Sequence, residues 1–270
     1  MEYVLPVLVF AALGIIAGIM LTVASKVFEV KTDPRIDEIN EVLPQVNCGS
    51  CGYSGCGDYA KSIVENGAPV NMCRPGGPEC AQKIAALMGV DAGGVNAQIA
   101  VVRCSGDCNA TAVKYQYHGQ QTCLSANKFY NGSKECTHAC LGFGDCAAVC
   151  PNGAISIKDG LARVDRSQCI GCGLCAKACP NNIIVIRDIT KQIDVCCSST
   201  EIGKVVRSVC KNGCIGCKLC EKKCEHDAIH VVDNLARIDY DKCVVCGKCA
   251  EACPTKAIRR CGQEYEVAKA

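Results

Sequence analysis

The chain has 270 residues, a formal net charge of +2, no Trp and only 4% aromatic residues. Aromatic side chains normally supply much of the buried area of a protein core, so this composition argues against one or two ordinary globular domains. The chain instead contains 28 Cys and four His, which indicates that cysteine chemistry holds it together.

Cysteine at this density indicates either disulfides in a secreted protein or thiolate–metal bonds in an intracellular one. Many of these cysteines stand two residues apart in runs of three. This spacing suits several corners of one metal centre better than bridges between distant strands. Zinc sites would have to be nearly all-thiolate, because the chain has so few His residues. The spacing therefore favours iron–sulfur clusters over disulfides and structural zinc.

The N-terminal segment predicts a transmembrane anchor over residues 1–28. Residues 4–24 are apolar and uncharged, and about 20 such residues in a helix span a hydrocarbon core of about 30 Å. Lys26, Lys31 and Arg35 follow this run and no Lys or Arg precedes it. The positive-inside rule then predicts a single-pass protein of the cytoplasmic (inner) membrane whose cluster domains face the cytoplasm. A cleaved signal peptide is the alternative, but the segment lacks a basic start and its apolar run is long.

Residues 29–92 predict a small loop–helix domain that binds one [4Fe–4S] cluster. Pro34 and the acidic stretch 37–41 read as a short linker into this domain. A short amphipathic helix is expected over residues 58–66, with Gly67 as its C-cap. The helix would bring the last cysteine of a C-x2-C-x4-C-x16-C pattern back toward the first three. The predicted ligands are Cys48, Cys51, Cys56 and Cys73.

The rest of the chain contains an internal repeat. At an offset of 74 residues, nine cysteines between positions 123 and 179 coincide with nine between 197 and 253. Residues 154–165 match residues 228–239, and each segment alternates apolar and polar residues around a D-G or D-N turn, which predicts a β-hairpin. We therefore expect two tandem modules, at residues 93–190 and 191–262, before a tail at 263–270.

Each module carries the cysteine run of the bacterial dicluster ferredoxins. In C-x2-C-x2-C-x3-C-P, three cysteines bind one cluster and the fourth binds the other. Three of the four module sites follow this rule directly. Their predicted ligands are Cys214, Cys217, Cys220 and Cys253; Cys243, Cys246, Cys249 and Cys224; and Cys169, Cys172, Cys175 and Cys150.

The fourth module site is altered, because Phe143 stands where the second module has Cys217. Its predicted ligands are Cys136, Cys140, Cys146 and Cys179. Five clusters are thus expected and a sixth is possible, with Cys104, Cys108 and Cys123 as candidate ligands and no fourth ligand identified. Buried free thiols are the alternative for these three. The roles of Cys80, Cys196, Cys197, Cys210 and Cys261 stay open.

These features predict an α+β protein that relays electrons and has no catalytic residues of its own. Neither a dinucleotide-binding motif, a P-loop nor a nucleophile–base pair is apparent, and the four His are expected to be structural. Residues 191–262 carry 13 Lys and Arg against 9 Asp and Glu. Lys218, Lys222, Lys223, Lys242 and Lys248 surround the cluster loops, which predicts either an ordinary solvated surface or a docking patch for an acidic electron carrier. No nucleic-acid recognition motif accompanies this charge.

The order of these parts resembles the B subunit of the Rnf complex, the ion-translocating ferredoxin:NAD oxidoreductase of bacterial membranes. An apolar helix, the block LPQVNCGSCGYSGCGDYA…MCRPGG and ferredoxin modules carry the resemblance. It implies that the chain takes electrons from reduced ferredoxin and passes them to other membrane subunits, so that the complex, and not this chain, couples electron flow to ion transport. It also implies that the cluster of Cys48, Cys51, Cys56 and Cys73 lies nearest the membrane. A polyferredoxin subunit of another membrane redox enzyme and a zinc-structured membrane adaptor are the alternatives.

Overall fold

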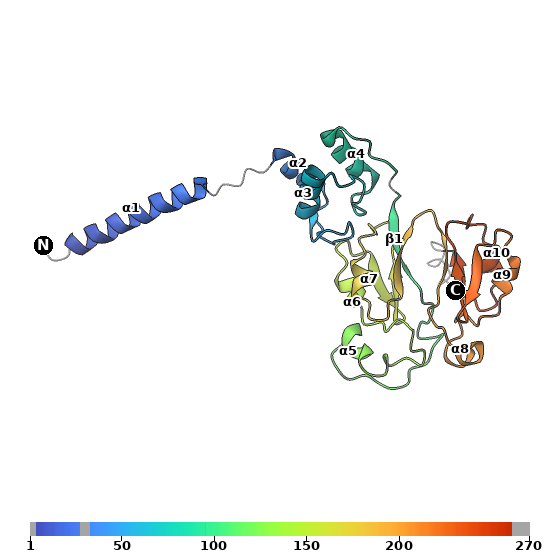
Figure 1. Ribbon diagram of the computed structural model, residues 1–270. Helices are drawn as coiled ribbons and strands as arrows, with labels where there is room; N and C mark the ends of the chain where they lie inside the picture. The colour runs from blue at the N-terminus through green and yellow to red at the C-terminus, as the bar shows by residue number, and fades with distance from the viewer. Residues whose placement is uncertain (1–3, 28–32, 95, 261–270) are drawn as a thin grey trace.

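The computed structural model describes residues 4–27, 33–94 and 96–260. Lys31, Cys261 and the tail expected at 263–270 lie outside these ranges. Helix α1 (Val4–Val27) stands apart from the remainder (Figure 1) and exposes large apolar side chains, among them Phe10 and Leu21. Of the helices within the described ranges, none meets the combined length and apolarity that define a membrane crossing. The predicted transmembrane anchor is therefore not confirmed by the structure.

The first cysteine block is helical and has its own core. It consists of α2 (Pro34–Val42), α3 (Cys56–Asn66) and α4 (Gly77–Met88). The predicted linker at 34–41 is wrong, because Asp33 caps the backbone N–H of Arg35 and Pro34 occupies the first turn, which together start a helix. Helix α3 ends at Gly67, whose φ of 65° is the predicted left-handed C-cap. Ile39, Tyr59 and Ile84 are fully buried where the three helices meet.

Two modules of the same plan follow. The first contains β1 (Gln98–Val102), α5 (Cys123–Asn127), α6 (Asp145–Ala148), β2 (Ile155–Lys158), β3 (Leu161–Val164), α7 (Leu174–Ala178) and β4 (Ile184–Asp188). The second contains β5 (Ile193–Val195), α8 (Gly203–Val209), α9 (Leu219–Lys223), β6 (Ile229–Val232), β7 (Leu235–Ile238), α10 (Lys248–Glu251) and β8 (Ile258–Arg260). In each module the first and last strands pair antiparallel, as β1–β4 and as β5–β8.

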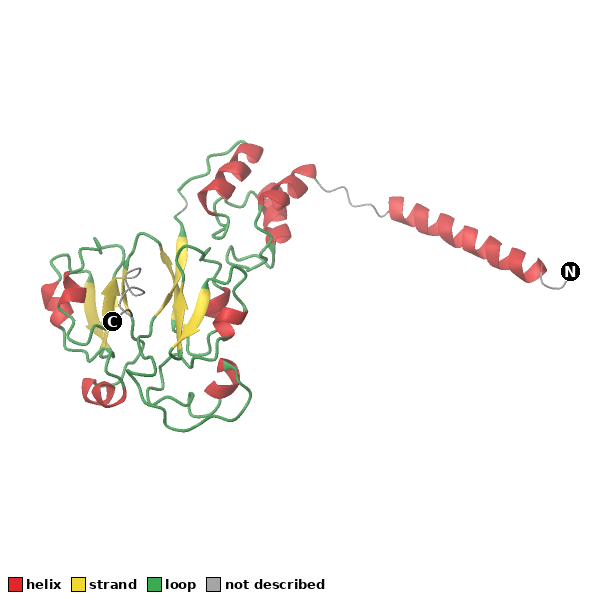
Figure 2. Ribbon diagram, turned by 180° about the vertical axis from the view of Figure 1, so that it is seen from behind, coloured by secondary structure: helices red, strands yellow, loops and turns green. Residues whose placement is uncertain are grey.

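Both predicted hairpins are confirmed, as the antiparallel pairs β2–β3 and β6–β7. Asp159 and Gly160 have φ values of 52° and 67°, and Asp233 and Asn234 have 51° and 61°. Two consecutive positive φ angles are what a two-residue type I′ hairpin requires, and Asp, Asn and Gly tolerate them best. Loops form most of the remaining chain in the modules (Figure 2).

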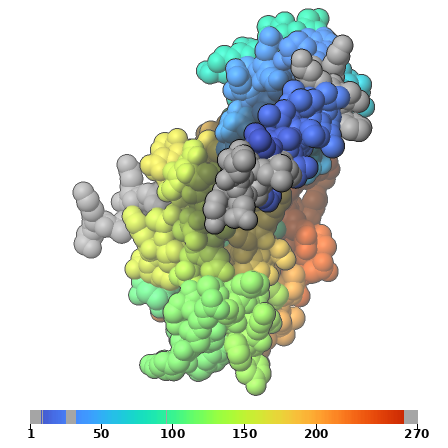
Figure 3. Space-filling view, turned by 90° about the vertical axis from the view of Figure 1, so that its left-hand side faces the viewer, coloured from blue at the N-terminus to red at the C-terminus, as the bar shows by residue number. Residues whose placement is uncertain are grey.

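The two modules lie side by side and share buried contacts. Arg187 of β4 stacks over the Tyr240 ring at 4.5 Å and pairs with the buried carboxylate of Asp194 at 3.5 Å. The helical block instead contacts the first module, where Lys177 donates a hydrogen bond to the Cys48 carbonyl at 2.8 Å. In Figure 3 this block lies above the first module. The chain thus places the first module between the helical block and the second module.

Candidate cluster sites

Four cavities of nearly equal size are lined by groups of cysteines in the modules. Each contains about 330–340 Å³ of space not filled by atoms. Two of them bring together all four cysteines of a predicted site. These sets are Cys150, Cys169, Cys172 and Cys175, and Cys224, Cys243, Cys246 and Cys249.

The predicted site of the second module's other cluster is also assembled. The thiols of Cys214, Cys217 and Cys253 all interact electrostatically with Cys220. Cys214 and Cys220 are buried in the same core as Ile229 and Leu235 of the hairpin, with Cys253 packed against it. The β6–β7 hairpin and Cys253, the ligand from the module's second cysteine run, therefore close this site from opposite ends of the module.

The altered site of the first module differs from the prediction. Its cavity is lined by Cys140, Cys146 and Cys179 as expected, but the fourth thiol is Cys123 instead of Cys136. Cys123 and Cys179 both interact electrostatically with Cys146. The structure therefore brings three of the four predicted ligands together, and Cys123 takes the corner that Phe143 leaves without a thiol.

Helix α5 holds Cys123 in this position. Its first turn is capped by the side chain of Thr122 and by the carboxylate of Asp145, which accepts hydrogen bonds from the backbone N–H groups of Cys123 at 2.9 Å and Leu124 at 3.0 Å. The Phe143 ring packs in the same small core, 5.7 Å from the ring of Tyr117. Asp145, 22 positions away in the sequence, thus fixes the position of the Cys123 thiol.

Cys136 lies at a different cavity, between the two modules. Its thiol interacts electrostatically with Cys197 and Cys210 of the second module, and Cys104 and Cys196 line the same cavity. From the sequence alone, Cys197 and Cys210 have no assigned site, and Cys104 is a candidate ligand of an incomplete one. The signal that could have found them is the repeat itself, since the 74-residue offset aligns Cys136 with Cys210 and Cys123 with Cys197.

The core of the helical block brings together three of its four predicted ligands, Cys51, Cys56 and Cys73, with a fifth cysteine, Cys80. Cys48, Cys56 and Cys73 are buried, and the Tyr59 hydroxyl is near the thiols of Cys51 and Cys73. Cys80, in the first turn of α4, shares a hydrogen bond with Cys73, and this bond together with burial raises the pKa of the Cys73 thiol. The fifth thiol therefore lies directly beside a predicted ligand.

Burial controls the acidity of these thiols. It raises the pKa of Cys146, Cys175 and Cys220 to about 12 and that of Cys249 to about 11. These four thiols are therefore neutral at pH 7 without a cluster, and cluster binding must displace their protons. No three His, Cys, Asp or Glu side chains of the described ranges converge on a single-ion position, and a four-iron cluster binds each thiolate at a separate corner.

Backbone N–H groups point at several of the sulfur atoms. Ala100 donates to Cys169 Sγ and Ala228 donates to Cys224 Sγ, each at 3.4 Å. Other thiols accept from the N–H two residues further on, as Cys172 does from Leu174 and Cys214 does from Gly216. Such hydrogen bonds favour the thiolate form and tune the potential of a bound cluster.

Neighbouring sites are connected through pairs of nearby thiols. Cys48 of the helical block interacts electrostatically with Cys172, and Cys175 interacts with Cys146 across the first module. At the far end of the chain, Cys217 and Cys246 are exposed, and Cys108 is exposed in the first module away from the four cavities. The helical block and the two sites of the first module thus lie in series, and two predicted ligands of the second module reach the surface.

Comparison with known proteins agrees with this arrangement. Residues 43–75 match the family described as "Putative Fe-S cluster", and residues 162–185 and 236–259 match the "4Fe-4S binding domain". These three segments contain the predicted block of Cys48 to Cys73 and the second cysteine run of each module. The chain therefore binds [4Fe–4S] clusters.

Relatives match over nearly the full length. The chain is 44% identical to the B subunit of the "Ion-translocating oxidoreductase complex" of Methanosarcina acetivorans, over 93% of this chain and 95% of the relative. It is 41% identical to the B subunit of the "Na(+)-translocating ferredoxin:NAD(+) oxidoreductase complex" of Acetobacterium woodii, over 94% of this chain and 76% of the relative. It is 40% identical to the B subunit of the corresponding proton-translocating complex of Clostridium ljungdahlii, over 93% and 90%. The chain belongs to the family of B subunits of ion-translocating oxidoreductase complexes, the Rnf family.

Proposed function

We propose that this subunit relays electrons from reduced ferredoxin, through a series of [4Fe–4S] clusters, to the redox subunits of an ion-translocating ferredoxin:NAD oxidoreductase complex. The observation that carries the proposal is that predicted cluster ligands gather around shared cavities in both modules, and that Cys48 of the helical block lies near Cys172 of the first module. Each bound cluster supplies one-electron redox chemistry. The chain's own residues hold the clusters, exclude water from them and set the order in which an electron reaches them.

The proposal includes five cluster sites, with Cys123 in place of Cys136 at the altered site, and the shared cavity of Cys123, Cys140, Cys146 and Cys179 supports this exchange. Three of them keep the ligands that the dicluster motif predicts. The remaining two are the helical block, with Cys48, Cys51, Cys56 and Cys73, and the altered site, with Cys123, Cys140, Cys146 and Cys179. The domain limits at 28/29, 92/93 and 190/191 are part of the proposal, and the strand pairs β1–β4 and β5–β8 lie within them.

The donor enters at the second module. Support comes from the exposed Cys217 and Cys246 and from the lysines around them. Lys248 pairs with Glu225 and Lys242 approaches Asp227 at 3.4 Å, so these two charges are partly neutralised. Lys218 and the two lysines of α9, Lys222 and Lys223, are exposed. An acidic ferredoxin would be steered to this end of the molecule by their positive charge.

Helix α1 anchors the chain to the lipid bilayer, with the cluster domains on the cytoplasmic side, and brings the helical block close to the membrane partners. The apolar sequence of residues 4–24 and the exposed side chains of Phe10, Ile16 and Leu21 support this part of the proposal. Lys26, Lys31 and Arg35 support the orientation.

Purified complex tests the electron relay. Stopped-flow mixing with reduced ferredoxin under anaerobic conditions should bleach the iron–sulfur absorption of this chain before NADH appears. NADH formation without prior reduction of these clusters would show that electrons bypass the chain.

A further inference from the structure

We propose that a sixth [4Fe–4S] cluster bridges the two modules, bound by Cys104 and Cys136 of the first module and by Cys197 and Cys210 of the second. This proposal extends the proposed electron relay and rests on it. The family matches do not assign these four residues, because the matched segments, 43–75, 162–185 and 236–259, contain none of them.

The four thiols line one cavity at the module boundary. Its volume of about 330 Å³, which includes open space at its mouth, is similar to those of the other three cysteine-lined cavities. Cys136 interacts electrostatically with Cys197 and Cys210. Gly106 marks the space between two of the sulfur atoms, because a Cβ at this position would lie 3.6 Å from Cys104 Sγ and 3.7 Å from Cys210 Sγ.

Hydrogen bonding around these thiols matches that at the predicted ligands. Cys104 Sγ accepts from the backbone N–H of Gly106 at 3.3 Å. Cys136 accepts from the N–H of His138, and Cys210 accepts from that of Asn212. All three bonds come from the residue two positions further on, as at Cys172 and Cys214. The loops are therefore shaped to hold thiolates.

A buried lysine supplies a second, independent observation. Lys134 is only 6% exposed, and its ammonium group donates to two neutral acceptors, the carbonyls of Gly106 at 3.0 Å and Gly160 at 2.7 Å. Its charge acts on the thiols of Cys104, Cys136 and Cys210. A buried cation normally has an anionic partner, and clusters ligated by four thiolates would supply that negative charge.

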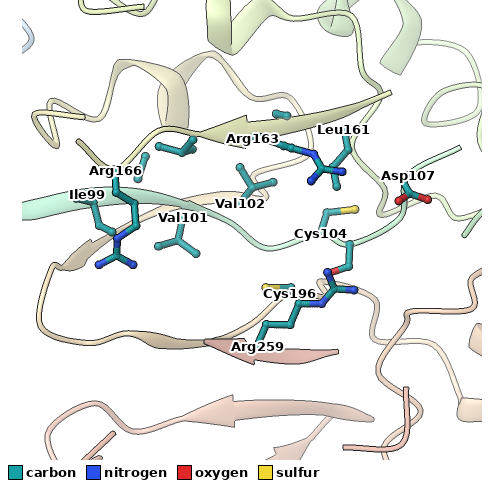
Figure 4. Close-up of a pocket in the computed structure, with 14 residues that line it drawn as sticks. Ile99, Val101, Val102, Cys104, Asp107, Leu161, Arg163, Arg166, Cys196 and Arg259 are labelled. Carbon is teal, nitrogen blue, oxygen red and sulfur yellow. The ribbon is translucent and has the colours of Figure 1, made fainter. Parts of the chain in front are cut away.

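The loops that carry these cysteines are joined across the boundary. Thr111 donates to the Val209 carbonyl at 2.7 Å, Ser198 donates to the Arg103 carbonyl at 2.9 Å, and Asn212 donates to the Ser105 carbonyl at 2.9 Å. Figure 4 shows the adjoining cavity, where Cys104 and Cys196 both appear, the former after β1 and the latter next to Arg259 of β8. The site is therefore built by segments from both modules.

Its position completes the electron path. Cys197 interacts electrostatically with Cys214 of the second module, and Cys104 Sγ accepts a hydrogen bond from the backbone N–H of Cys140 at 3.4 Å. Loading the site forms four Fe–S bonds and releases one proton from each thiol. A cluster held by these four cysteines would supply a one-electron site between the Cys214 and Cys140 sites.

Iron and acid-labile sulfide analysis of the anaerobically purified full-length protein tests this proposal. The wild type should contain about 24 irons per chain, from six four-iron clusters. Cys136→Ala and Cys210→Ala, which lie in different modules, should each lose about four irons and four sulfides. Cys108→Ala is the matched control, because this exposed thiol lies outside the cavity, and it should keep the full content.

A wild-type content of about 20 irons overturns the sixth site but leaves the five-cluster relay intact, whereas iron-free protein overturns the relay itself. Zinc in place of iron, or an unchanged iron content in both alanine variants, also overturns the bridging cluster. If either variant fails to fold, the wild-type iron count still decides between five clusters and six. In the variants that fold, electrons from the second module should reach the first at least tenfold more slowly than in the wild type.

Discussion

Phe143 decides which thiol completes the altered site, and its substitution gives a direct test of Cys123. Cys123→Ala should lose about four irons, whereas the double variant Cys123→Ala/Phe143→Cys should recover them. The reason is that a thiol at position 143 would restore the C-x2-C-x2-C spacing that the second module has at Cys214, Cys217 and Cys220. Iron analysis and the visible absorption of anaerobic samples measure the outcome, and a Cys123→Ala protein with full iron content would refute the assignment.

Asp145 acts on this site only by positioning α5. Asp145→Ala removes the acceptor of two backbone N–H groups at the helix start, which we expect to cost about 1 kcal/mol of stability. We expect Asp145→Ala to lose one cluster to a chelator faster than the wild type does. Asp145→Asn should lose it at an intermediate rate, because its amide oxygen still accepts hydrogen bonds from the backbone N–H groups. Equal rates of iron loss in wild type and both variants would contradict this role.

Lys134 should set the potentials of the clusters on either side of it. Removing its positive charge disfavours the reduced, more negative state, so Lys134→Met should lower the reduction potential of the nearest cluster. An electrostatic change on the order of 1 kcal/mol corresponds to about 40 mV for a one-electron couple. Lys134→Arg, which keeps the charge, is the control, and an EPR-monitored redox titration measures the shift. Unchanged potentials in Lys134→Met would show that the ammonium group lies outside the clusters' field.

Among the elements, the hairpins and helix α3 were predictable, whereas the site of Cys136 was not. The D-G and D-N turns and the Gly67 cap are local signals that act within a few residues. The position of Cys123 depends instead on contact with Asp145, and that of Cys136 depends on loops from the other module. If each repeat is self-contained, Cys136 belongs to a site in its own module. Its partners Cys197 and Cys210 instead lie in the other module, 61 and 74 positions further along the sequence.

Helix α9 and the loop before it carry lysines to which the proposed function assigns donor docking. Lys218→Glu/Lys222→Glu should slow reduction by ferredoxin about tenfold at low ionic strength, because steering of the carrier is weakened. The difference from the wild type should shrink as salt rises. Lys128→Glu/Lys158→Glu places the same charge change on lysines of the first module and should have little effect. Equal slowing by both pairs would indicate a general charge effect and no docking site.

For the whole molecule, the proposed function makes membrane attachment depend on α1. Ile15→Arg/Ile16→Arg places two charges in the middle of the apolar run, each costing about 3 kcal/mol in a bilayer. The wild type should stay with membranes through an alkaline carbonate wash, and the double variant should be released. Ile202→Arg, a charge introduced at another exposed apolar residue, should remain bound. Release of the wild type by the same wash would contradict the anchor.

The structure as a whole is a series of cysteine sites that runs from the exposed end of the second module, across the module boundary and through the first module to the helical block. Because each [4Fe–4S] cluster takes up one electron, the series has a countable capacity. Anaerobic reductive titration of the full-length protein measures that capacity most directly. The proposed relay predicts an uptake of about five electrons per chain, or about six with the bridging cluster, with bleaching of the iron–sulfur absorption. A protein that takes up no electrons would contradict it.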